Sequence, residues 1–336
     1  MADAARRAQP KVLVLYNEDP SWPQYDIESS QAMLTVLTDG LREQGYPYAA
    51  HQFFDDLSGL DAYDPREWLV WNWGEELAGR PWTEAEVADE LERRGLAYTG
   101  APPAVLRRLQ NRLQVKEALR AAGLPTLPAR VFTDPALAGE WEHYPAMVKG
   151  ANQHASYGIT REAVAANAAE LAIRIDYLRR SFNDEALVEP FLDTREFQVA
   201  VWGNRDPQAL PPQEFDYSAF DDQRDRLYTY DWKFNPQSRG YSEIKMVCPA
   251  PADRPDWRAR LMEVSVEAYR SLGLRDYGRI DLRMQGDEPQ ILDVNANPDL
   301  EYISVLPASS RSVGLNYGAM LDHILRLAAE RMPADG

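Results

Sequence analysis

The sequence predicts an α/β protein whose first hundred residues form an open parallel sheet. Two short apolar runs, KVLVLYN at 11–17 and EWLVWNW at 67–73, have the β-branched and aromatic content of buried strands. A helical pattern follows each of them, and this strand-helix order is typical of parallel sheets. The chain has 336 residues, which is too long for one simple core and predicts two or three domains.

The two helices of this first part are predicted from periodicity and end signals. Leu34, Leu37 and Leu41 fall on one face of the first helix, and Gly45 ends it. The second helix spans 83–95, opening with threonine and glutamate at capping-box spacing and ending at a glycine.

A boundary is expected at GAPP, residues 100–103, and more strands and helices follow it. Residues 104–125 predict one continuous helix, 161–182 a long helix, 257–272 another, and 314–332 a closing helix. ARVF, PAMVKG, EALVEPFL and EFQVAVWGN predict strands, whereas 213–245 give no clear assignment. We expect three domains, spanning 1–104, 105–188 and 189–336.

Charge and cysteine content restrict the class of protein. Lys and Arg number 36 against 53 Asp and Glu, a net charge of −17, so binding to nucleic acid or to an anionic membrane is not expected. The one cysteine, Cys248, allows no intrachain disulfide and fits a cytoplasmic location. The apolar run near the start is too short for a signal peptide or a membrane span.

The segment YGRIDLRMQGDEPQILDVNANP, residues 277–298, predicts a hairpin that carries chemistry. Apolar and polar residues alternate in both halves, and QGDE is a turn signal. Folding the hairpin symmetrically about 286–288 places Asp281 opposite Asp293 and Arg279 opposite Asn295. This symmetric pairing also puts Ile291 on the face of Asp293.

Two opposed carboxylates repel one another unless a cation or a proton lies between them. Asp281, Asp293 and the amide of Asn295 offer the oxygen ligands that Mg²⁺ prefers. Arg279 beside them could balance the acids or stabilise charge on a phosphoryl or tetrahedral oxygen. A surface hairpin with solvated acids is the alternative, and we favour the metal site for the combination of residues.

The hairpin GRIDLRM…QILDVNANP resembles the metal-binding hairpin of ATP-grasp ligases, in particular of the D-alanine–D-alanine ligases. Further segments match that family in the same order: LAYTGAPP, LQNRLQVKEALRAAGLPTLPARVF, YPAMVKGANQHASYGIT, ALVEPFLDTREFQVAVWGN, KMVCPAP and ISVLPA. The resemblance covers roughly 11–330. It implies an ATP-grasp fold of three α/β domains, with ATP held between two antiparallel sheets.

The resemblance also implies a reaction and its participants. ATP converts a substrate carboxylate into an acyl phosphate, and an amine then displaces phosphate to form a dipeptide or a related amide. ATP and Mg²⁺ are the implied cofactors, and a small carboxylate and a small amine are the substrates. Pairing into a homodimer is left open.

Site residues follow from the resemblance position by position. Arg279 and Ser156 would be catalytic, and Asp281, Asp293 and Asn295 would bind Mg²⁺. Residues carried over to ATP are Arg112 on phosphate, Lys149 on the α-phosphate and adenine side, Glu189 and Leu192 at the adenine hinge, Glu196 at the ribose, and Lys233 on the terminal phosphates. Each of these could also be an ordinary surface or strand residue, Lys233 most readily.

Several motifs depart from the family pattern and bear on the substrates. The phosphate loop reads NQHASYG instead of glycine with two serines, and VWNWGEE replaces a glycine-rich acidic stretch. Asp26 or Glu28 falls where the first substrate's ammonium would bind, although both could simply favour the first turn of a helix. Ser304 aligns with a serine that touches substrate carboxylate.

Asp299 stands where the family has a glycine. A carboxylate there would repel a substrate carboxylate and attract an ammonium or guanidinium group. We therefore expect that the amine substrate is not plain D-alanine. It would instead carry extra positive charge or lack the free carboxylate of D-alanine. Alternatively Asp299 caps the following turn. Competing functions are a genuine D-alanine–D-alanine ligase, a non-catalytic nucleotide-binding protein and an ATP-grasp kinase.

Overall fold

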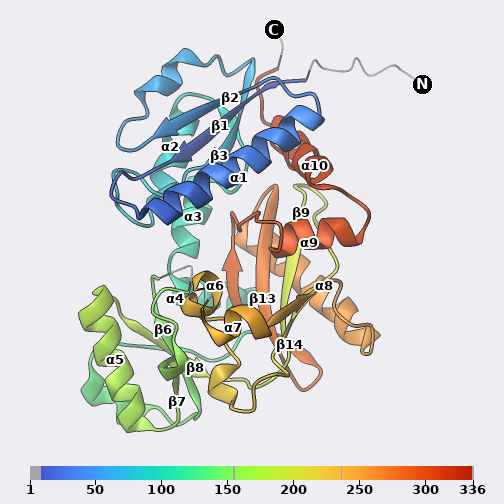
Figure 1. The fold of residues 1–336 in the computed structure, drawn as a ribbon. Helices are drawn as coiled ribbons and strands as arrows, with labels where there is room; N and C mark the ends of the chain where they lie inside the picture. Colours follow the sequence, from blue (N-terminus) through green and yellow to red (C-terminus); the bar gives the residue numbers. More distant parts are fainter. Residues whose placement is uncertain (1–8, 154–155, 236, 335–336) are drawn as a thin grey trace.

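The computed structural model describes residues 9–334 except 154–155 and 236, and its elements are built around three sheets (Figure 1). The first sheet has the strand order β2-β1-β3-β4, and all its strand pairs are parallel. The predicted open parallel sheet is therefore confirmed. Its elements are β1 (Lys11–Asn17), α1 (Gln24–Glu43), β2 (Tyr48–Phe53), β3 (Trp68–Trp73), α2 (Glu84–Arg93) and β4 (Ala97–Tyr98).

Both faces of the first sheet are covered, which explains the unbroken apolar run of β1. Val12 and Val14 pack in the same core cluster as Leu41 of α1, whereas Leu13 and Leu15 pack in the other large cluster. The strand β2 was not predicted from the sequence. The expected capping box of α2 is also wrong in detail, because the threonine hydroxyl at its start bonds the preceding loop instead.

Residues 104–125 form two helices, not one. α3 (Pro103–Leu109) and α4 (Arg112–Ala121) are separated by Asn111, whose side chain accepts a hydrogen bond from the backbone N–H of Gln114 at 3.0 Å. This N-cap restarts the helix after a break that apolar periodicity does not reveal. The restart matters because it buries Arg112 on the inner face of α4.

The second sheet is antiparallel, with the order β5-β8-β6-β7. It comprises β5 (Arg130–Phe132), β6 (Ala146–Gly150), β7 (Val164–Ala165) and β8 (Ala186–Pro190), and α5 (Ala168–Phe182) covers one face. The helix expected over 161–182 is too long, because its first residues form a 3-10 turn at 161–163 and then β7. Asn167 caps the true start of α5.

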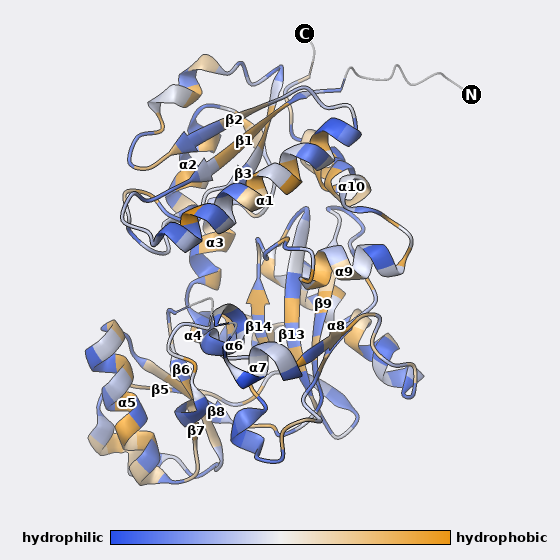
Figure 2. Cartoon of the chain, in the orientation of Figure 1, coloured by the Kyte–Doolittle hydropathy of each residue, from blue (hydrophilic) through white to orange (hydrophobic). Residues whose placement is uncertain are grey.

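The third sheet is also antiparallel, in the order β12-β11-β9-β13-β14, with β10 paired to β9. Its strands are β9 (Glu196–Trp202), β10 (Gln208–Ala209), β11 (Gln213–Asp216), β12 (Lys245–Val247), β13 (Tyr277–Gln285) and β14 (Glu288–Asn295). Hydrophobic and hydrophilic residues follow one another along β13 (Figure 2). The segment left unassigned contains α6 (Tyr230–Phe234) and α7 (Arg239–Glu243).

Three C-terminal helices complete the fold. α8 (Pro255–Leu272) packs on β9, β13 and β14, and α9 (Val305–Ser312) packs on β9 and β11. The closing helix α10 (Tyr317–Ala329) returns to the first sheet and packs against α1 (Figure 1). Short 3-10 turns occupy 58–62, 135–140 and 223–225. The division into three domains stays a proposal, and β8 crosses the expected boundary after residue 188.

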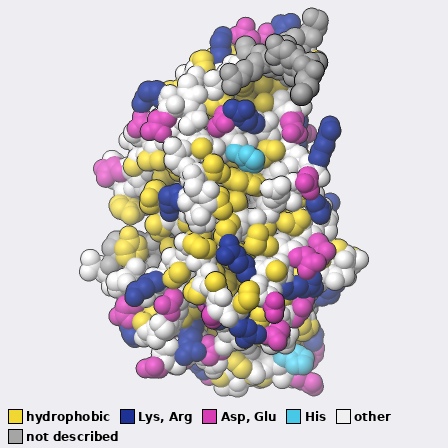
Figure 3. All heavy atoms as spheres, turned by 90° about the vertical axis from the view of Figure 1, so that its right-hand side faces the viewer, with side chains coloured by type: hydrophobic (Ala, Val, Ile, Leu, Met, Phe, Trp, Pro, Cys, Tyr) yellow, Lys and Arg dark blue, Asp and Glu magenta, His cyan; other side chains and the backbone are white. Residues whose placement is uncertain are grey.

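The junction between the first and third sheets is close. Gly100, with φ +95°, donates its N–H to the buried carboxylate of Asp276 at 2.8 Å, and a Cβ at this glycine would lie 2.2 Å from Asn297. The face toward α9 and α10 carries many apolar side chains across its middle, with Lys or Arg side chains among them, and most of its acidic side chains lie toward the edges (Figure 3). Every helix in the described part of the chain is too short or too polar to cross a bilayer.

Candidate active site

The hairpin β13–β14 brings the predicted metal residues together. Asp281 pairs with Asp293 and Arg279 with Asn295, as predicted. The guanidinium of Arg279 grips Asp281 through two contacts, Nε to Oδ1 at 2.7 Å and Nη2 to Oδ2 at 3.0 Å. Burial raises the pKa of Asp281; Arg279 opposes this effect, and Asp293 adds to it.

The pairing of Asp281 with Asp293 was predicted from a symmetric hairpin, but the hairpin in the structure is not symmetric. The turn contains only Gly286 and Asp287, and a bulge between Asp281 and Leu282 restores the pairing. Leu282 therefore faces Ile291, which is buried in the core, so the prediction that placed Ile291 on the face of Asp293 was wrong. Bulges bend a strand and re-aim its groups beside active sites.

Lysine 149 meets the hairpin at this irregular point. It leaves β6 beside the phosphate loop, and its Nζ donates to the carbonyl oxygen of Leu292 at 3.2 Å. The same Nζ lies 2.8 Å from Oε1 of Glu189 on β8. The predicted nucleotide residues Lys149 and Glu189 are thus in contact with each other and adjacent to the predicted metal residue Asp293.

A second lysine, Lys116 of α4, was missed by the sequence analysis. Its Nζ lies 2.6 Å from Oε2 of Glu189 and donates to Thr126 Oγ1 at 3.0 Å. The side chains of Lys116 and Glu189 are each 2 % exposed. The sequence signal was its spacing, because Lys116 follows Arg112 by one turn and shares its helix face.

Arg112 reaches the metal residues instead of standing apart from them. Its Nε lies 3.1 Å from Oδ2 of Asp293, and its Nη1 donates to the carbonyl oxygen of Gly150 at 2.7 Å. The structure thus shows Arg112 in an ion pair with the hairpin, and its contact with phosphate stays a prediction. Arg112 and Arg279 hold one carboxylate each, so the cluster is balanced in charge without any ion.

The predicted ribose residue, Glu196, is oriented by two neighbours. Arg283 donates to it through Nε at 2.9 Å and Nη2 at 2.6 Å, and the hydroxyl of Tyr217 donates at 3.0 Å. Arg283 also donates to the carbonyl oxygen of Leu192, the predicted hinge residue. The role of Arg283 was missed, although it lies on the same strand face as Arg279 and Asp281.

The phosphate loop meets the segment that connects β11 and β12 of the third sheet. Ser156 has a left-handed backbone, φ +61°, and its hydroxyl donates to the carbonyl oxygen of Tyr228 at 3.3 Å. His154 and Ala155 of this loop lie outside the described residues. Lys233 stands over the ring of Tyr228, with its Nζ 5.1 Å from the centroid. Burial, with help from Arg279, lowers the pKa of Lys233 to about 8.

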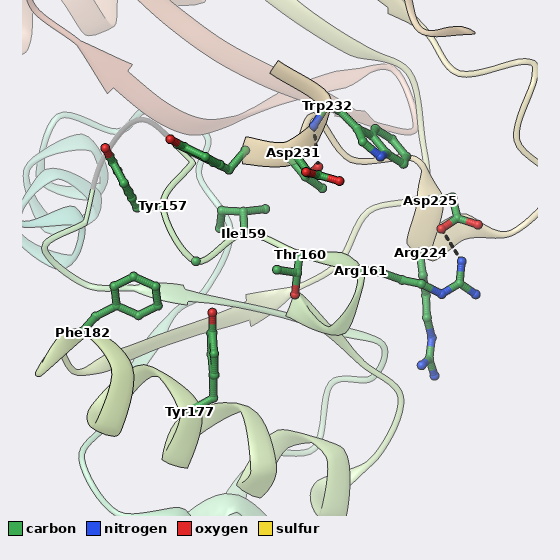
Figure 4. Close-up of a pocket in the computed structure, with 13 residues that line it drawn as sticks. Tyr157, Ile159, Thr160, Arg161, Tyr177, Phe182, Arg224, Asp225, Asp231 and Trp232 are labelled. Atoms are coloured by element: carbon green, nitrogen blue, oxygen red, sulfur yellow. Dashed lines mark hydrogen bonds and ion pairs between the residues drawn. The ribbon is translucent and has the colours of Figure 1, made fainter. Parts of the chain in front are cut away.

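A cavity of about 510 Å³ lies between this loop, α5 and the segment 224–232 (Figure 4). Aromatic side chains dominate its walls, among them Tyr157, Tyr177, Phe182 and Trp232. None of the residues predicted to bind ATP, metal or substrate lines it. The cavity therefore lies beside the candidate site and is not its chemical centre.

The predicted substrate residues are placed differently from one another. Asp26, in the first turn of α1, lies close enough to Tyr157 of the phosphate loop to raise its pKa, after burial and Tyr230. Glu28 is exposed and accepts a hydrogen bond from the side chain of Gln24 at 3.1 Å, one turn earlier in α1. Asp299 accepts hydrogen bonds from the N–H of Glu301 at 2.9 Å and the hydroxyl of Ser304 at 3.1 Å.

Glu75, which follows β3 of the first sheet, lies close enough to Asp299 for the two carboxylates to influence one another. The surrounding protein raises the pKa of Glu75 to about 7, with Asp299 and then Glu76 adding to the effect. The pKa of Glu84 is also raised to about 7, by burial and then by Glu75. In the sequence, VWNWGEE stood out only as a departure from the family, and the role of its two glutamates was not predicted.

The donor set of the hairpin fits a hard divalent cation. Asp281 and Asp293 are opposed on adjacent strands, and the side chain of Asn295 lies 3.4 Å from Asp281, so three oxygen-bearing side chains converge. Within the described ranges no group of three or more His, Cys, Asp or Glu residues is arranged for a metal. Two carboxylates with an amide are nevertheless typical of Mg²⁺ sites, where substrate phosphates complete the coordination.

Comparison with known proteins adds an independent line of support. A family model described as "D-ala D-ala ligase C-terminus" matches residues 119–326. The D-alanine–D-alanine ligase of Desulforudis audaxviator is 31% identical over 246 residues, covering 72% of this chain and 76% of that protein. The corresponding ligase of Desulfovibrio desulfuricans is 30% identical over 312 residues, covering 90% and 92%.

Solved structures agree on the fold. The D-alanine–D-alanine ligase of Bacillus anthracis superposes with a TM-score of 0.69 at 19% identity, over 96% of this chain and 98% of that one. Its complex with ATP gives a TM-score of 0.68 at 18% identity over the same shares. The expected ATP-grasp fold is confirmed. The chain belongs to the D-alanine–D-alanine ligase family and is an ATP-dependent, ADP-forming ligase that joins a carboxylate to an amine.

Proposed function

We propose that this ligase activates a small carboxylate at the junction of the second and third sheets. The carboxylate oxygen bonds to the γ-phosphorus of ATP, the bridge to the β-phosphate breaks, and ADP leaves. The amine nitrogen then bonds to the carbonyl carbon, phosphate departs and the amine loses a proton. The supporting observation is the contact of Lys149 and Arg112 with β14, which joins predicted nucleotide and metal residues in one site.

Asp281, Asp293 and Asn295 would hold Mg²⁺ in this proposal, because their oxygens converge on one end of the hairpin. The ion would supply positive charge to the phosphate oxygens. Arg279 supports the transferring phosphoryl group and the tetrahedral intermediate, and Lys233 supports the terminal phosphates. Ser156 contributes from the phosphate loop, where its positive φ marks a tight backbone turn of the kind whose N–H groups can bind phosphate.

The nucleotide is held by residues of the second and third sheets. Lys149 meets the α-phosphate, Glu189 and Leu192 border the adenine, and Glu196 accepts the ribose hydroxyls. Arg283 supports this assignment, because it fixes both the carboxylate of Glu196 and the carbonyl of Leu192.

The amine substrate is proposed to differ from plain D-alanine. Asp299 engages the hydroxyl of Ser304 and the N–H of Glu301, donors that could otherwise hold a substrate carboxylate. These contacts also support the capping role that the sequence left open, and the charge of Asp299 remains in either case. An acceptor that lacks a free carboxylate, or carries extra positive charge, fits this surrounding. Asp26 is the better-placed of the two candidates for the first ammonium group.

The test is ADP release by the intact chain with ATP and Mg²⁺, across a panel of carboxylates and amines, with mass detection of the product. The proposal requires ADP formation that depends on both substrates and a product mass equal to their sum less water. ADP release with a carboxylate alone would instead indicate a kinase. D-alanine in both positions belongs in the panel, because the relatives carry that name.

The metal assignment has its own variants in the same assay. Asp293→Ala should abolish Mg²⁺-dependent turnover, whereas Asp287→Ala in the turn of the same hairpin should leave it intact, because Asp287 pairs with Arg254 at the surface. Full activity of Asp293→Ala would refute the assignment. The homodimer stays a prediction for light scattering on the purified chain.

A further inference from the structure

Lys116 shares the carboxylate of Glu189 with Lys149, one ammonium group on each oxygen. The distances are 2.6 Å from Lys116 to Oε2 and 2.8 Å from Lys149 to Oε1. The three side chains come from α4, β8 and β6, and each is at most 8 % exposed. Thr126 holds the ammonium group of Lys116 in place, because its hydroxyl accepts a hydrogen bond from Lys116 and donates one to the carbonyl oxygen of Ile291 at 2.8 Å.

Lys116, Lys149 and Glu189 together carry a different net charge from the pair of Lys149 and Glu189. Lys149 and Glu189 alone would form a neutral pair, which offers little attraction to a phosphate. Burial lowers the pKa of Lys116, and the carboxylate of Glu189 at 2.6 Å opposes this effect and favours the ammonium form. In that form Lys116 raises the total to one positive charge, in surroundings where charge acts strongly because water is largely excluded. Burial is the largest influence on Glu189 and would raise its pKa, but the two lysines together lower it, so the carboxylate stays ionised.

We propose that Lys116 is a positioning residue that leaves the Lys149–Glu189 pair positively charged for the phosphates of the nucleotide. The proposal rests on the proposed function, in which Lys149 meets the α-phosphate. Lys116 is buried in the core and acts through Glu189. It binds one carboxylate oxygen of Glu189, so that the other oxygen stays in contact with Lys149. Its positive charge also balances the negative charge of Glu189, which would otherwise cancel the charge of Lys149.

A purely structural role for Lys116 predicts something different. A buried ion pair that only holds the fold would affect stability, and it would affect every ligand of the cleft alike. A role in charge affects ligands in proportion to their phosphates. The ratio of the Kd of adenosine to the Kd of ATP isolates this phosphate contribution, because both ligands share the base and the ribose.

The experiment measures both dissociation constants by calorimetry on the intact chain, together with its melting temperature. The variants are Lys116→Met, which keeps the length of the side chain, Glu189→Gln, and the double variant. Arg120→Met is the matched control, because it removes one positive charge one turn further along α4 from an exposed position.

Lys116→Met should lower the ratio by about tenfold, and Arg120→Met should leave it within about twofold. The double variant again carries one positive charge, on Lys149, so its ratio should return close to that of the wild type. The proposal is overturned if Lys116→Met weakens adenosine and ATP equally, or if the double variant is as impaired as the single one.

Two further outcomes remain decisive. If Lys116→Met does not fold, the comparison moves to the Glu189→Gln background, where removing Lys116 must lower the ratio from its value in Glu189→Gln; no change there overturns the proposal. If the wild type binds ATP no better than adenosine, the assignment of Lys149 to phosphate fails, and with it the proposed nucleotide site, which separates that failure from the failure of the role of Lys116.

Discussion

The guanidinium of Arg112 holds the carboxylate of Asp293, with 3.1 Å between Nε and Oδ2, although 181 residues separate them in the chain. This ion pair links α4 to β14 and thereby joins the second and third sheets at the candidate site. Asp281 is held in the same way by Arg279. Each predicted metal carboxylate is thus paired with an arginine before any cation binds, and a cation must compete with that pairing.

Replacing Arg112 by methionine should change the affinities for the metal and for the nucleotide in opposite directions. Asp293 loses the positive charge of Arg112 while still facing Asp281, so a divalent cation is attracted more strongly and half-saturation with Mg²⁺ should need several-fold less metal. ATP should bind several-fold more weakly, because a cation beside the phosphates is lost. ADP formation measured against Mg²⁺ at fixed ATP, and against ATP at fixed Mg²⁺, gives both quantities.

Arg112→Lys is the matched control, since it keeps the charge but not the paired geometry. It should lie between the wild type and Arg112→Met for both constants. If Arg112→Met weakened metal and nucleotide alike, Arg112 would be holding the hairpin in place and not setting its charge.

The hairpin was predictable because its signal is local. Alternation along 277–285 and 288–295 fixes which side chains share a face, and a turn signal between them fixes the partner. The bulge beside Asp281 was not predictable, because it depends on packing of Ile291 into the core. It changed the neighbour of Leu282 yet left the pair Asp281–Asp293 intact.

Residues that act through distant partners could not be assigned from one sequence. Lys116 has its carboxylate 73 positions further along the chain, on Glu189, and Arg283 has its own 87 positions earlier, on Glu196. A buried lysine and a surface lysine look alike when only helix periodicity is known. The break at Asn111 was hidden for a related reason, because a single side-chain cap outweighs the apolar pattern around it.

The low pKa of Lys233 predicts an alkaline limb in the activity profile. Its pKa is lowered to about 8, chiefly by burial, so the ammonium group is charged below that pH and loses its proton above it. Since the charged form supports the phosphates, kcat/KM for ATP should fall by about tenfold per pH unit above pH 8. The profile is measured from pH 6 to 10 at saturating carboxylate and amine.

The conservative variant identifies the titrating group. Lys233→Arg carries a guanidinium that stays protonated over this range, so its profile should remain flat to about pH 10 even if its maximum is lower. An alkaline limb that persists unchanged in Lys233→Arg would assign the titration to another group.

The pair of Arg331 and Asp276 predicts a large contribution to stability from the end of the chain. The side chain of Asp276 is fully buried and is held by both terminal nitrogens of Arg331, with contacts of 2.8 and 2.5 Å. Arg331→Met leaves that carboxylate without its cation and should lower the free energy of unfolding by about 3 kcal/mol. Urea unfolding measures the change. Arg326→Met removes an exposed guanidinium, and Asp322 keeps its hydrogen bond from Tyr46, so this control should cost no more than about 0.5 kcal/mol.

Two substitutions at Asp299 separate its charge from its hydrogen bonds. Asp299→Asn can still accept from the N–H of Glu301 through its one oxygen and can donate its amide NH2 to the hydroxyl of Ser304, whereas Asp299→Gly loses both contacts. If the charge selects the amine, both variants should shift preference by about tenfold toward acceptors that carry a free carboxylate, because one repulsive charge is removed. Competition between a carboxylate-bearing amine and its amidated counterpart, with both products quantified by mass, measures that preference directly.

Two outcomes of the same experiment would contradict the idea that the charge of Asp299 selects the amine. A shift in Asp299→Gly alone would mean that the cap, and not the charge, shapes the acceptor site. A preference unchanged in both would remove Asp299 from substrate recognition.

Asp299 also contributes to the raised pKa of Glu75, about 7, so Asp299→Asn should lower the pKa of that carboxyl. Nuclear magnetic resonance of the glutamate carboxyl carbons detects this change even where no turnover occurs, and it shows whether Glu75 and Asp299 lie close together in solution.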